Sequence, residues 1–135
     1  MAKNFFTHAF ADNIRLAKSR TLIAPAVDTY NLIRLPKRAF LKQVWLYVKT
    51  ATTAGGTTMT IGFVGNEEAA DPDAFLTDTE CDPQTAGMKT SLGGSAAWAA
   101  GKYFDKGGGM ITLTVGSANA TAFEGIVFAS YVVIY

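Results

Sequence analysis

The stretch VWLYVKTATTAGGTTMTIGFVGNEEAADPDAF, residues 44–75, decides the fold because it contains two strand-like runs separated by a pair of glycines. In the second run Met59, Ile61 and Phe63 alternate with threonine and glycine, which is typical of a half-buried antiparallel strand. Gly55-Gly56 supplies the positive φ that a tight turn requires. The two runs are therefore predicted to form a β-hairpin, and an acidic loop follows it.

The first run extends back to Phe40 and is apolar on both faces. One predicted face carries Phe40, Val44, Leu46 and Val48, and the other carries Leu41, Trp45 and Tyr47. A strand of this kind lies either in the centre of a protein or at a contact between subunits. The C-terminal run, residues 121–135, has the same two-sided character. This excess of apolar strand surface predicts association with other copies or with a larger shell.

The remaining chain shows further short strands separated by turn signals. Residues 21–24, 29–35, 96–104 and 110–115 read as strands, and residues 65–94 read as a long loop that Phe75 and Leu76 attach to the core. A length of 135 residues fits one domain. Seven or eight strands with almost no helix indicate an all-β fold, an antiparallel β-sandwich that is jelly-roll-like.

An N-terminal arm, residues 1–20, is expected to precede a β-sandwich domain at residues 21–135. Apolar side chains recur in the arm at roughly helical spacing, namely Phe5, Phe6, Ala9, Phe10, Ile14 and Ala17. The phenylalanines predict that the arm packs on its own domain or on a partner. The chain shows no signal-peptide layout and no membrane-length apolar segment, so we expect a soluble protein without a membrane partner, made in a host cytoplasm.

Charge is distributed unevenly along the chain. Residues 1–49 hold nine basic and two acidic side chains, a balance of +7, whereas residues 67–82 hold seven acidic side chains and no basic one. Such asymmetry can orient a protein against neighbours of complementary charge, although two solvated loops of opposite sign explain it equally well.

Catalytic chemistry has little support in the sequence. The chain has one histidine, His8, and one cysteine, Cys81, which is too few for a structural zinc site and unfavourable for a nucleophile–base pair. Asp71, Asp73 and Asp78 offer oxygen ligands for calcium but do not follow the EF-hand spacing, so a solvated loop is the simpler interpretation. Glycoside hydrolysis requires two carboxylates at a set distance in space, and the spacing of residues along the sequence does not reveal that distance.

The sequence gives little support to nucleic-acid or sugar binding. The basic residues are scattered rather than clustered, and no phosphate-binding loop is present, so no direct nucleic-acid contact is expected. Trp45 and Trp98 are able to form a sugar platform, but tryptophans of a small β-sandwich more often serve as core or subunit contacts.

The order of these motifs resembles the small β-sandwich virion proteins of tailed bacteriophages, particularly capsid decoration (cement) proteins. The resemblance spans about residues 30–135, and its most specific part combines VKTA at 48–51, TMTIG at 58–62 and DPDAF at 71–75. It implies a jelly-roll-like subunit that binds the major capsid protein on the virion surface, commonly as a homotrimer. It also implies no enzymatic activity and no cofactor.

The leading hypothesis from the sequence is therefore a non-enzymatic protein that stabilises a phage head. The residues expected at capsid or subunit contacts are Phe5, Phe6, Phe10, Arg15, Arg34, Lys37, Arg38, Trp45 and Tyr47. The alternative is a head-fibre or tail module that binds a host glycan or receptor through exposed tryptophans. A third hypothesis is a small hydrolase that uses carboxylates from residues 67–82.

Overall fold

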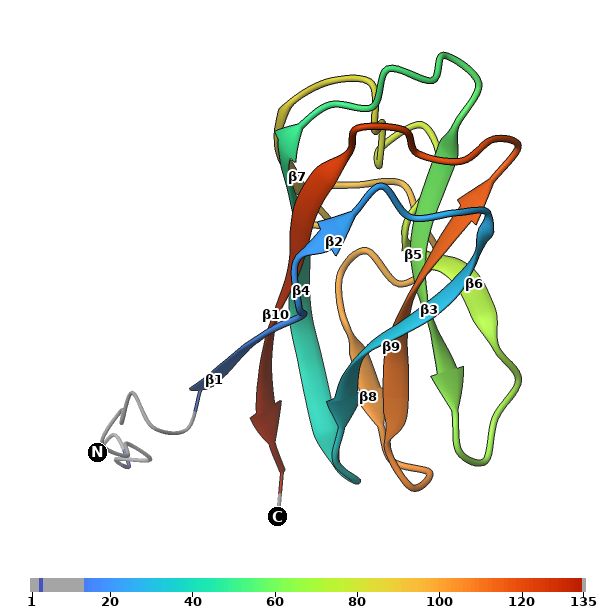
Figure 1. Ribbon diagram of the computed structural model, residues 1–135. Coiled ribbons are helices and arrows are strands. Elements are labelled where there is room, and N and C mark those ends of the chain that lie inside the picture. Colours follow the sequence, from blue (N-terminus) through green and yellow to red (C-terminus); the bar gives the residue numbers. More distant parts are fainter. Residues whose placement is uncertain (1–2, 4–13, 135) are drawn as a thin grey trace.

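The computed structural model of the protein describes Lys3 and residues 14–134 (Figure 1). Within these residues the chain forms ten strands and no helix. The strands are β1 (Ile14–Lys18), β2 (Leu22–Ile23), β3 (Asp28–Leu35), β4 (Ala39–Thr50), β5 (Thr58–Gly65), β6 (Asp71–Leu76), β7 (Gly87–Thr90), β8 (Lys102–Phe104), β9 (Gly109–Gly116) and β10 (Glu124–Val133). No helix in this part of the chain is therefore long and apolar enough to cross a membrane.

The strands form two antiparallel sheets that face each other (Figure 1). Sheet A has the order β1-β10-β4-β7. The short strand β2 also pairs with β10, and the short strand β8 also pairs with β4. Sheet B has the order β3-β9-β5-β6. The pairings are nested, because β5 pairs with β6, β4 with β7 and β8, β3 with β9, and β1 and β2 with β10. A long antiparallel ribbon folded over in this way is a jelly roll, which confirms the all-β, jelly-roll-like sandwich.

The core lies between the sheets and is filled by the inward-facing residue of each alternating pair. Phe75, Phe104 and Phe123 are its largest fully buried side chains, and β4, β5 and β9 contribute most of the aliphatic ones. Burial of one such large side chain contributes about 1.5–3 kcal/mol, so the alternation in β4, β5 and β9 is sufficient to orient both sheets. The expectation that Phe75 and Leu76 attach the acidic segment to the core is confirmed.

The predicted hairpin between the two runs of the opening stretch is wrong. Strand β4 belongs to sheet A and β5 to sheet B, so residues 51–57 cross from one sheet to the other. Neither Gly55 nor Gly56 has a positive φ. The crossing is held by Thr52, whose N–H donates to the Pro83 carbonyl at 2.9 Å and whose hydroxyl donates to the Thr121 carbonyl at 2.8 Å. Partners distant in the sequence therefore replace the local turn.

The predicted assignment of faces in residues 40–50 is wrong at its start. Ser130 is opposite Gln43 and Tyr131 is opposite Leu41, so Lys42 is an extra residue at a β-bulge. The bulge reverses the alternation, which buries Leu41 on the same side as Val44. Phe40 consequently shares the outer face with Trp45 and Tyr47.

Three further expectations about elements are corrected. Residues 14–18, with their nearly helical spacing, form strand β1, which pairs with β10 over its whole length. The strand predicted at residues 96–104 is reduced to β8, because residues 97–100 form turns. The segment read as a loop, residues 65–94, contains the strands β6 and β7.

Candidate interaction surface

The outer face of sheet A carries many large apolar residues next to polar ones such as Lys18 and Gln43. The large apolar residues, here called the apolar face, come from four neighbouring strands and are Ile14, Leu16, Phe40, Trp45, Tyr47, Met88, Ile126, Phe128 and Val132. Leu16 is 69% exposed, Met88 57% and Ile14 54%. Contiguous exposure of this kind is unusual for a free monomer, which makes this face the candidate interaction surface.

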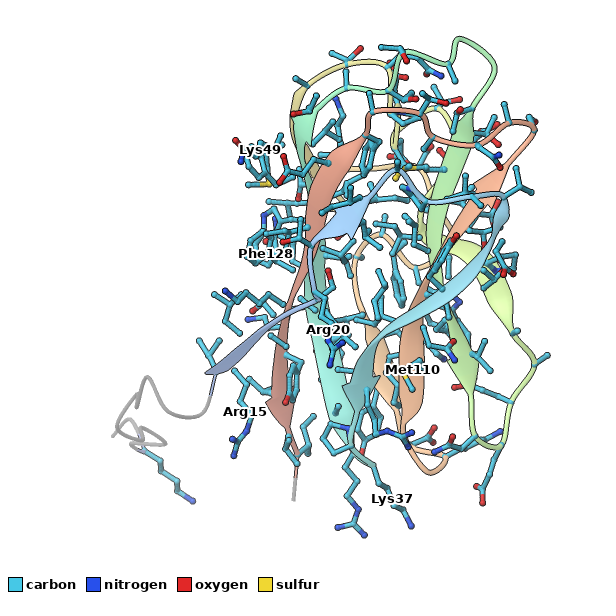
Figure 2. All side chains as sticks on the ribbon, in the orientation of Figure 1. Arg15, Arg20, Lys37, Lys49, Met110 and Phe128 are labelled. Atoms are coloured by element: carbon cyan, nitrogen blue, oxygen red, sulfur yellow. The ribbon has the colours of Figure 1, made fainter. Side chains whose placement is uncertain are left out.

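A groove runs across the apolar face and is lined by one residue from each of four strands. The lining residues are Leu16 of β1, Phe128 of β10, Trp45 of β4 and Met88 of β7, and the open groove between them has a volume of about 220 Å³. Figure 2 shows Phe128 projecting from sheet A on the side away from sheet B. All four lining side chains are apolar, so the groove suits an apolar side chain rather than a charged ligand.

The outer face of sheet B is more polar at its centre, although Val64 and Met110 also lie on it. Thr29, Thr114 and Thr60 are aligned across β3, β9 and β5, and the Thr29 and Thr114 hydroxyls lie 3.2 Å apart. Such a threonine row is well satisfied by water and by cross-strand hydrogen bonds. The two outer surfaces of the sandwich therefore differ, and sheet A carries the candidate contact.

The predicted contact residues fall into three groups. Trp45 and Tyr47 lie on the apolar face. Arg34, Lys37 and Arg38 are exposed at the end of β3 and in the turn to β4, and this group is called the basic end. The Arg38 carbonyl accepts the Ile134 N–H at 2.9 Å, which holds the end of the chain beside this turn.

The other predicted contact residues lie elsewhere. Arg15 is exposed on β1, and Figure 2 shows it at the same end of the molecule as Lys37. Phe5, Phe6 and Phe10 lie outside the described residues.

The sequence did not single out Leu16 and Met88, which are the most exposed residues of the apolar face. Leu16 lies in a segment whose spacing resembled a helix, and Met88 lies in the segment read as a loop. Phe128 carried a usable signal, because it belongs to the C-terminal run that is apolar on both faces.

Carboxylates of the acidic segment are engaged within the chain. Glu80 accepts hydrogen bonds from the Thr77 N–H and hydroxyl and from the Ser95 N–H. Asp82 accepts the Gln84 N–H and the Thr85 hydroxyl, and Glu68 pairs with a lysine. Among residues 14–134 no group of three or more His, Cys, Asp or Glu side chains is arranged to hold a metal ion. These described residues therefore contain no cluster of ligands that would support the calcium interpretation.

Three titratable groups of this segment have shifted pKa values. Hydrogen bonds from Gln84 and Thr85 lower the pKa of Asp82. Burial, together with the neighbouring Asp73, raises the pKa of Asp71. Burial also raises the pKa of the Cys81 thiol, whose side chain is fully enclosed, so this cysteine is a core residue rather than a nucleophile.

A buried lysine lies under the acidic segment. Lys102 Nζ is 3.0 Å from Glu68 Oε2, and the lysine side chain is only 6% exposed. The ammonium also lies over the ring of Trp98, 4.3 Å from its centroid, and over the rings of Phe63 and Phe104 at 4.8 and 5.2 Å. The three aromatic rings and the carboxylate compensate the charge that burial would otherwise leave unsolvated. Because the ammonium covers one face of Trp98, this ring is partly unavailable as a sugar platform.

The fold relates the chain to solved structures, whereas its sequence does not relate it to a known family. No protein-family description matches the sequence, and no curated protein matches it. A chain in the acidic stable capsid structure of Helicobacter pylori bacteriophage KHP30 aligns with a TM-score of 0.65 and 22% identity, over 89% of this chain and 87% of that one.

Two further phage structures contain similar chains. A chain of the cyanophage Pam1 capsid asymmetric unit aligns with a TM-score of 0.69 and 15% identity, over 99% of this chain and 94% of that one. A chain of the Ralstonia phage GP4 capsid aligns with a TM-score of 0.63 and 18% identity, over 98% and 92%. At these identities the likeness establishes a shared fold over nearly the whole length of each chain.

Proposed function

We propose that the protein is a structural virion protein of a tailed bacteriophage, which binds the major capsid protein on the head surface and stabilises the shell as a homotrimer. In this role it acts as a decoration protein and performs no catalysis. The observation that carries the proposal is the apolar face, on a fold that recurs in three phage capsid structures.

The apolar face supports the proposal on energetic grounds. Each square ångström of apolar surface removed from water contributes about 25 cal/mol, before the entropy of association is subtracted. Leu16, Met88 and Ile14 are each more than half exposed, so an association that covers them gains more than one that covers the threonine row. We therefore assign this face to contacts with other copies or with the capsid.

The basic end supports a second contact of different character. Arg34, Lys37 and Arg38 project from one end of the sandwich and are exposed. Exposed charges contribute little to affinity but steer and orient association with a surface of opposite charge. We assign the basic end, with Arg15, to orientation against an acidic surface of the shell.

Co-sedimentation with empty phage heads tests the proposal. Native protein is expected to pellet with heads, and Leu16→Glu/Met88→Glu is expected to lose most of this binding, because two carboxylates on the apolar face oppose its burial. Thr29→Glu/Thr60→Glu is the matched control, since it places two carboxylates on sheet B. Absence of native protein from the pellet, or equal loss in both variants, contradicts the proposal.

The same protein samples separate the alternatives. Binding to a glycan array that is lost in Trp98→Ala supports a fibre or tail module instead. Hydrolysis of a glycoside that is lost in Asp73→Asn supports the hydrolase hypothesis. Either result without head binding replaces the proposal.

A further inference from the structure

The groove on the apolar face has the size and the chemistry of a site for one aromatic side chain. It is open to solvent and has a volume of about 220 Å³ between Leu16, Trp45, Met88 and Phe128. A closed apolar cavity of about 150 Å³ accepts benzene, so the volume of this open groove is sufficient for a phenyl ring with one side left exposed. Met88 adds a flexible, polarisable wall of the type that packs well against aromatic rings.

The N-terminal segment of the chain supplies a matching ligand. Residues 4–11, NFFTHAFA, contain three phenylalanines and no Asp, Glu, Lys or Arg. An uncharged segment rich in phenylalanine complements a groove without charged lining residues. The 13 residues before Ile14 extend to about 47 Å at most. The four strands of the groove span only about 14 Å at the usual strand spacing.

The direction of β1 favours the groove of a second copy over that of the same chain. Ile14 is opposite Val132, next to the end of β10 at Val133, whereas Leu16 of the groove lies further inside the sheet. Strand β1 therefore runs, from Leu16 back to Ile14, away from the groove and toward the end of β10. Docking in the groove of the same chain would require a reversal of direction before Ile14, and this requirement favours the groove of a second copy.

We infer that the groove of one copy binds a phenylalanine side chain from residues 5–10 of a second copy, so that exchanged N-terminal segments join the copies in solution. This inference rests on the proposed function, because that proposal includes the association of identical copies. It adds which residues make the contact between the copies. The apolar face thereby acts as receptor for the chain's own N-terminal segment, before any capsid is present.

Mixing two variants of the full-length chain, each with one added cysteine, tests this inference. Ala9→Cys keeps all three phenylalanines, and Met88→Cys places a thiol at the groove. Native Cys81 stays in both variants, because it is fully buried. After mild oxidation at micromolar concentration, a disulfide-linked heterodimer is expected on a non-reducing gel, several-fold above the dimer formed by either variant alone.

Three controls make the result specific. Replacing Met88→Cys by Thr29→Cys, on the outer face of sheet B, is expected to give no excess of heterodimer. Replacement of Phe5, Phe6 and Phe10 by serine in the Ala9→Cys chain is expected to abolish the cross-link. Circular dichroism checks that each variant keeps its β spectrum.

Two outcomes overturn the inference. One is a heterodimer yield no higher than with the Thr29→Cys control. The other is a disulfide within a single chain of the double variant Ala9→Cys/Met88→Cys without any cross-link between chains, because it shows that the segment docks on its own domain. Co-sedimentation of the same preparations with heads is scored separately. Head binding without cross-linking rejects only this inference, and cross-linking without head binding rejects only the proposed capsid role.

Discussion

At the scale of single residues, Lys102 is a charged side chain that is held on several sides. Its ammonium is enclosed by Glu68 and by the rings of Trp98, Phe63 and Phe104, and the two charged partners differ in exposure, 6% for Lys102 against 23% for Glu68. Removal of one partner of a buried pair is costly only when the charge that remains is itself buried. The two possible deletions are therefore not equivalent.

We predict that Glu68→Gln destabilises the protein by about 1–3 kcal/mol, a range reduced because Glu68 is partly exposed, and that Lys102→Met changes stability by less than about 1 kcal/mol. Glu68→Gln leaves a buried ammonium without its counter-ion. Lys102→Met retains an apolar chain of similar length among three rings and leaves Glu68 in reach of water. Urea unfolding of the two variants measures the difference, and equal losses contradict the argument.

Two aspartates of the acidic segment are predicted to affect stability with opposite dependence on pH. The folded pKa of Asp82 is lowered, so between its folded and unfolded values the unfolded chain binds more protons. Its contribution is present above the ordinary carboxyl pKa and is lost as pH falls through the folded value. The folded pKa of Asp71 is raised, so its ionised form opposes folding above that value, and stability is regained as pH falls through it.

Substitution of each aspartate by asparagine tests whether its effect on stability has the predicted sign. At neutral pH Asp82→Asn is expected to lower the free energy of unfolding, and Asp71→Asn to raise it. Both differences from the native protein are expected to shrink in acid, where the aspartates are protonated in the folded and the unfolded chain. Urea unfolding at a series of pH values measures this, and a shift of the same sign in both variants contradicts the assignment.

At the scale of elements, two buried serines complete sheet A where its edge strands stop. Ser19, between β1 and β2, donates its N–H to the Val127 carbonyl at 2.8 Å and accepts the Val127 N–H on its hydroxyl at 3.0 Å. Ser91, directly after β7, does the same for Val44, with both distances 2.9 Å. Each serine thus takes the place of a neighbouring strand residue, because its N–H and its hydroxyl make the two hydrogen bonds that such a residue would make.

We predict that Ser19→Ala and Ser91→Ala each destabilise the protein by about 1–3 kcal/mol, because each leaves a buried strand N–H without an acceptor. Ser95→Ala is the matched control, since Ser95 is exposed and donates to Glu80 through its backbone N–H. Thermal unfolding of the three variants measures the effect. A loss in Ser95→Ala as large as in the other two contradicts it.

The long strands could be predicted from alternation, but their pairing could not. Strands β3, β4, β5, β9 and β10 all lie where apolar and polar residues alternate or where both faces are apolar. The hairpin at Gly55-Gly56 was wrong because each strand's partner is far away in a nested ribbon, which local spacing does not encode. The bulge at Lys42 left no signal either, since it arises from the fit of β4 to β10.

The candidate site could be predicted only in part, for a related reason. Trp45 and Tyr47 stand out on a long strand that is apolar on both faces. Leu16 and Met88 belong to strands of five and four residues, which are too short for a period of two to become visible. Their importance comes from the two strands between them, and only the assembled sheet places them on one surface.

At the scale of the whole molecule, the sandwich presents surfaces of three kinds. Sheet A exposes the apolar face, sheet B exposes a threonine row, and the basic end projects Arg34, Lys37 and Arg38. A core requires apolar residues only between the sheets, so neither the apolar face nor the basic end is explained by the stability of the isolated domain. Binding through the apolar face depends on burial of apolar surface, and binding through the basic end depends on charge. The salt concentration therefore distinguishes the two contributions.

We predict that Arg34→Ala/Lys37→Ala/Arg38→Ala weakens head binding several-fold at low salt and that its difference from the native protein disappears near 1 M salt. At about 1 M the screening length falls to roughly 3 Å, so exposed charges no longer contribute to attraction. Leu16→Glu/Met88→Glu is expected to remain weaker than native at both salt concentrations, because burial of apolar surface is not screened. Co-sedimentation across a salt series measures both curves. If the triple variant keeps the same deficit at high salt, then the basic end makes direct contacts with the shell, and its role as an electrostatic guide is wrong.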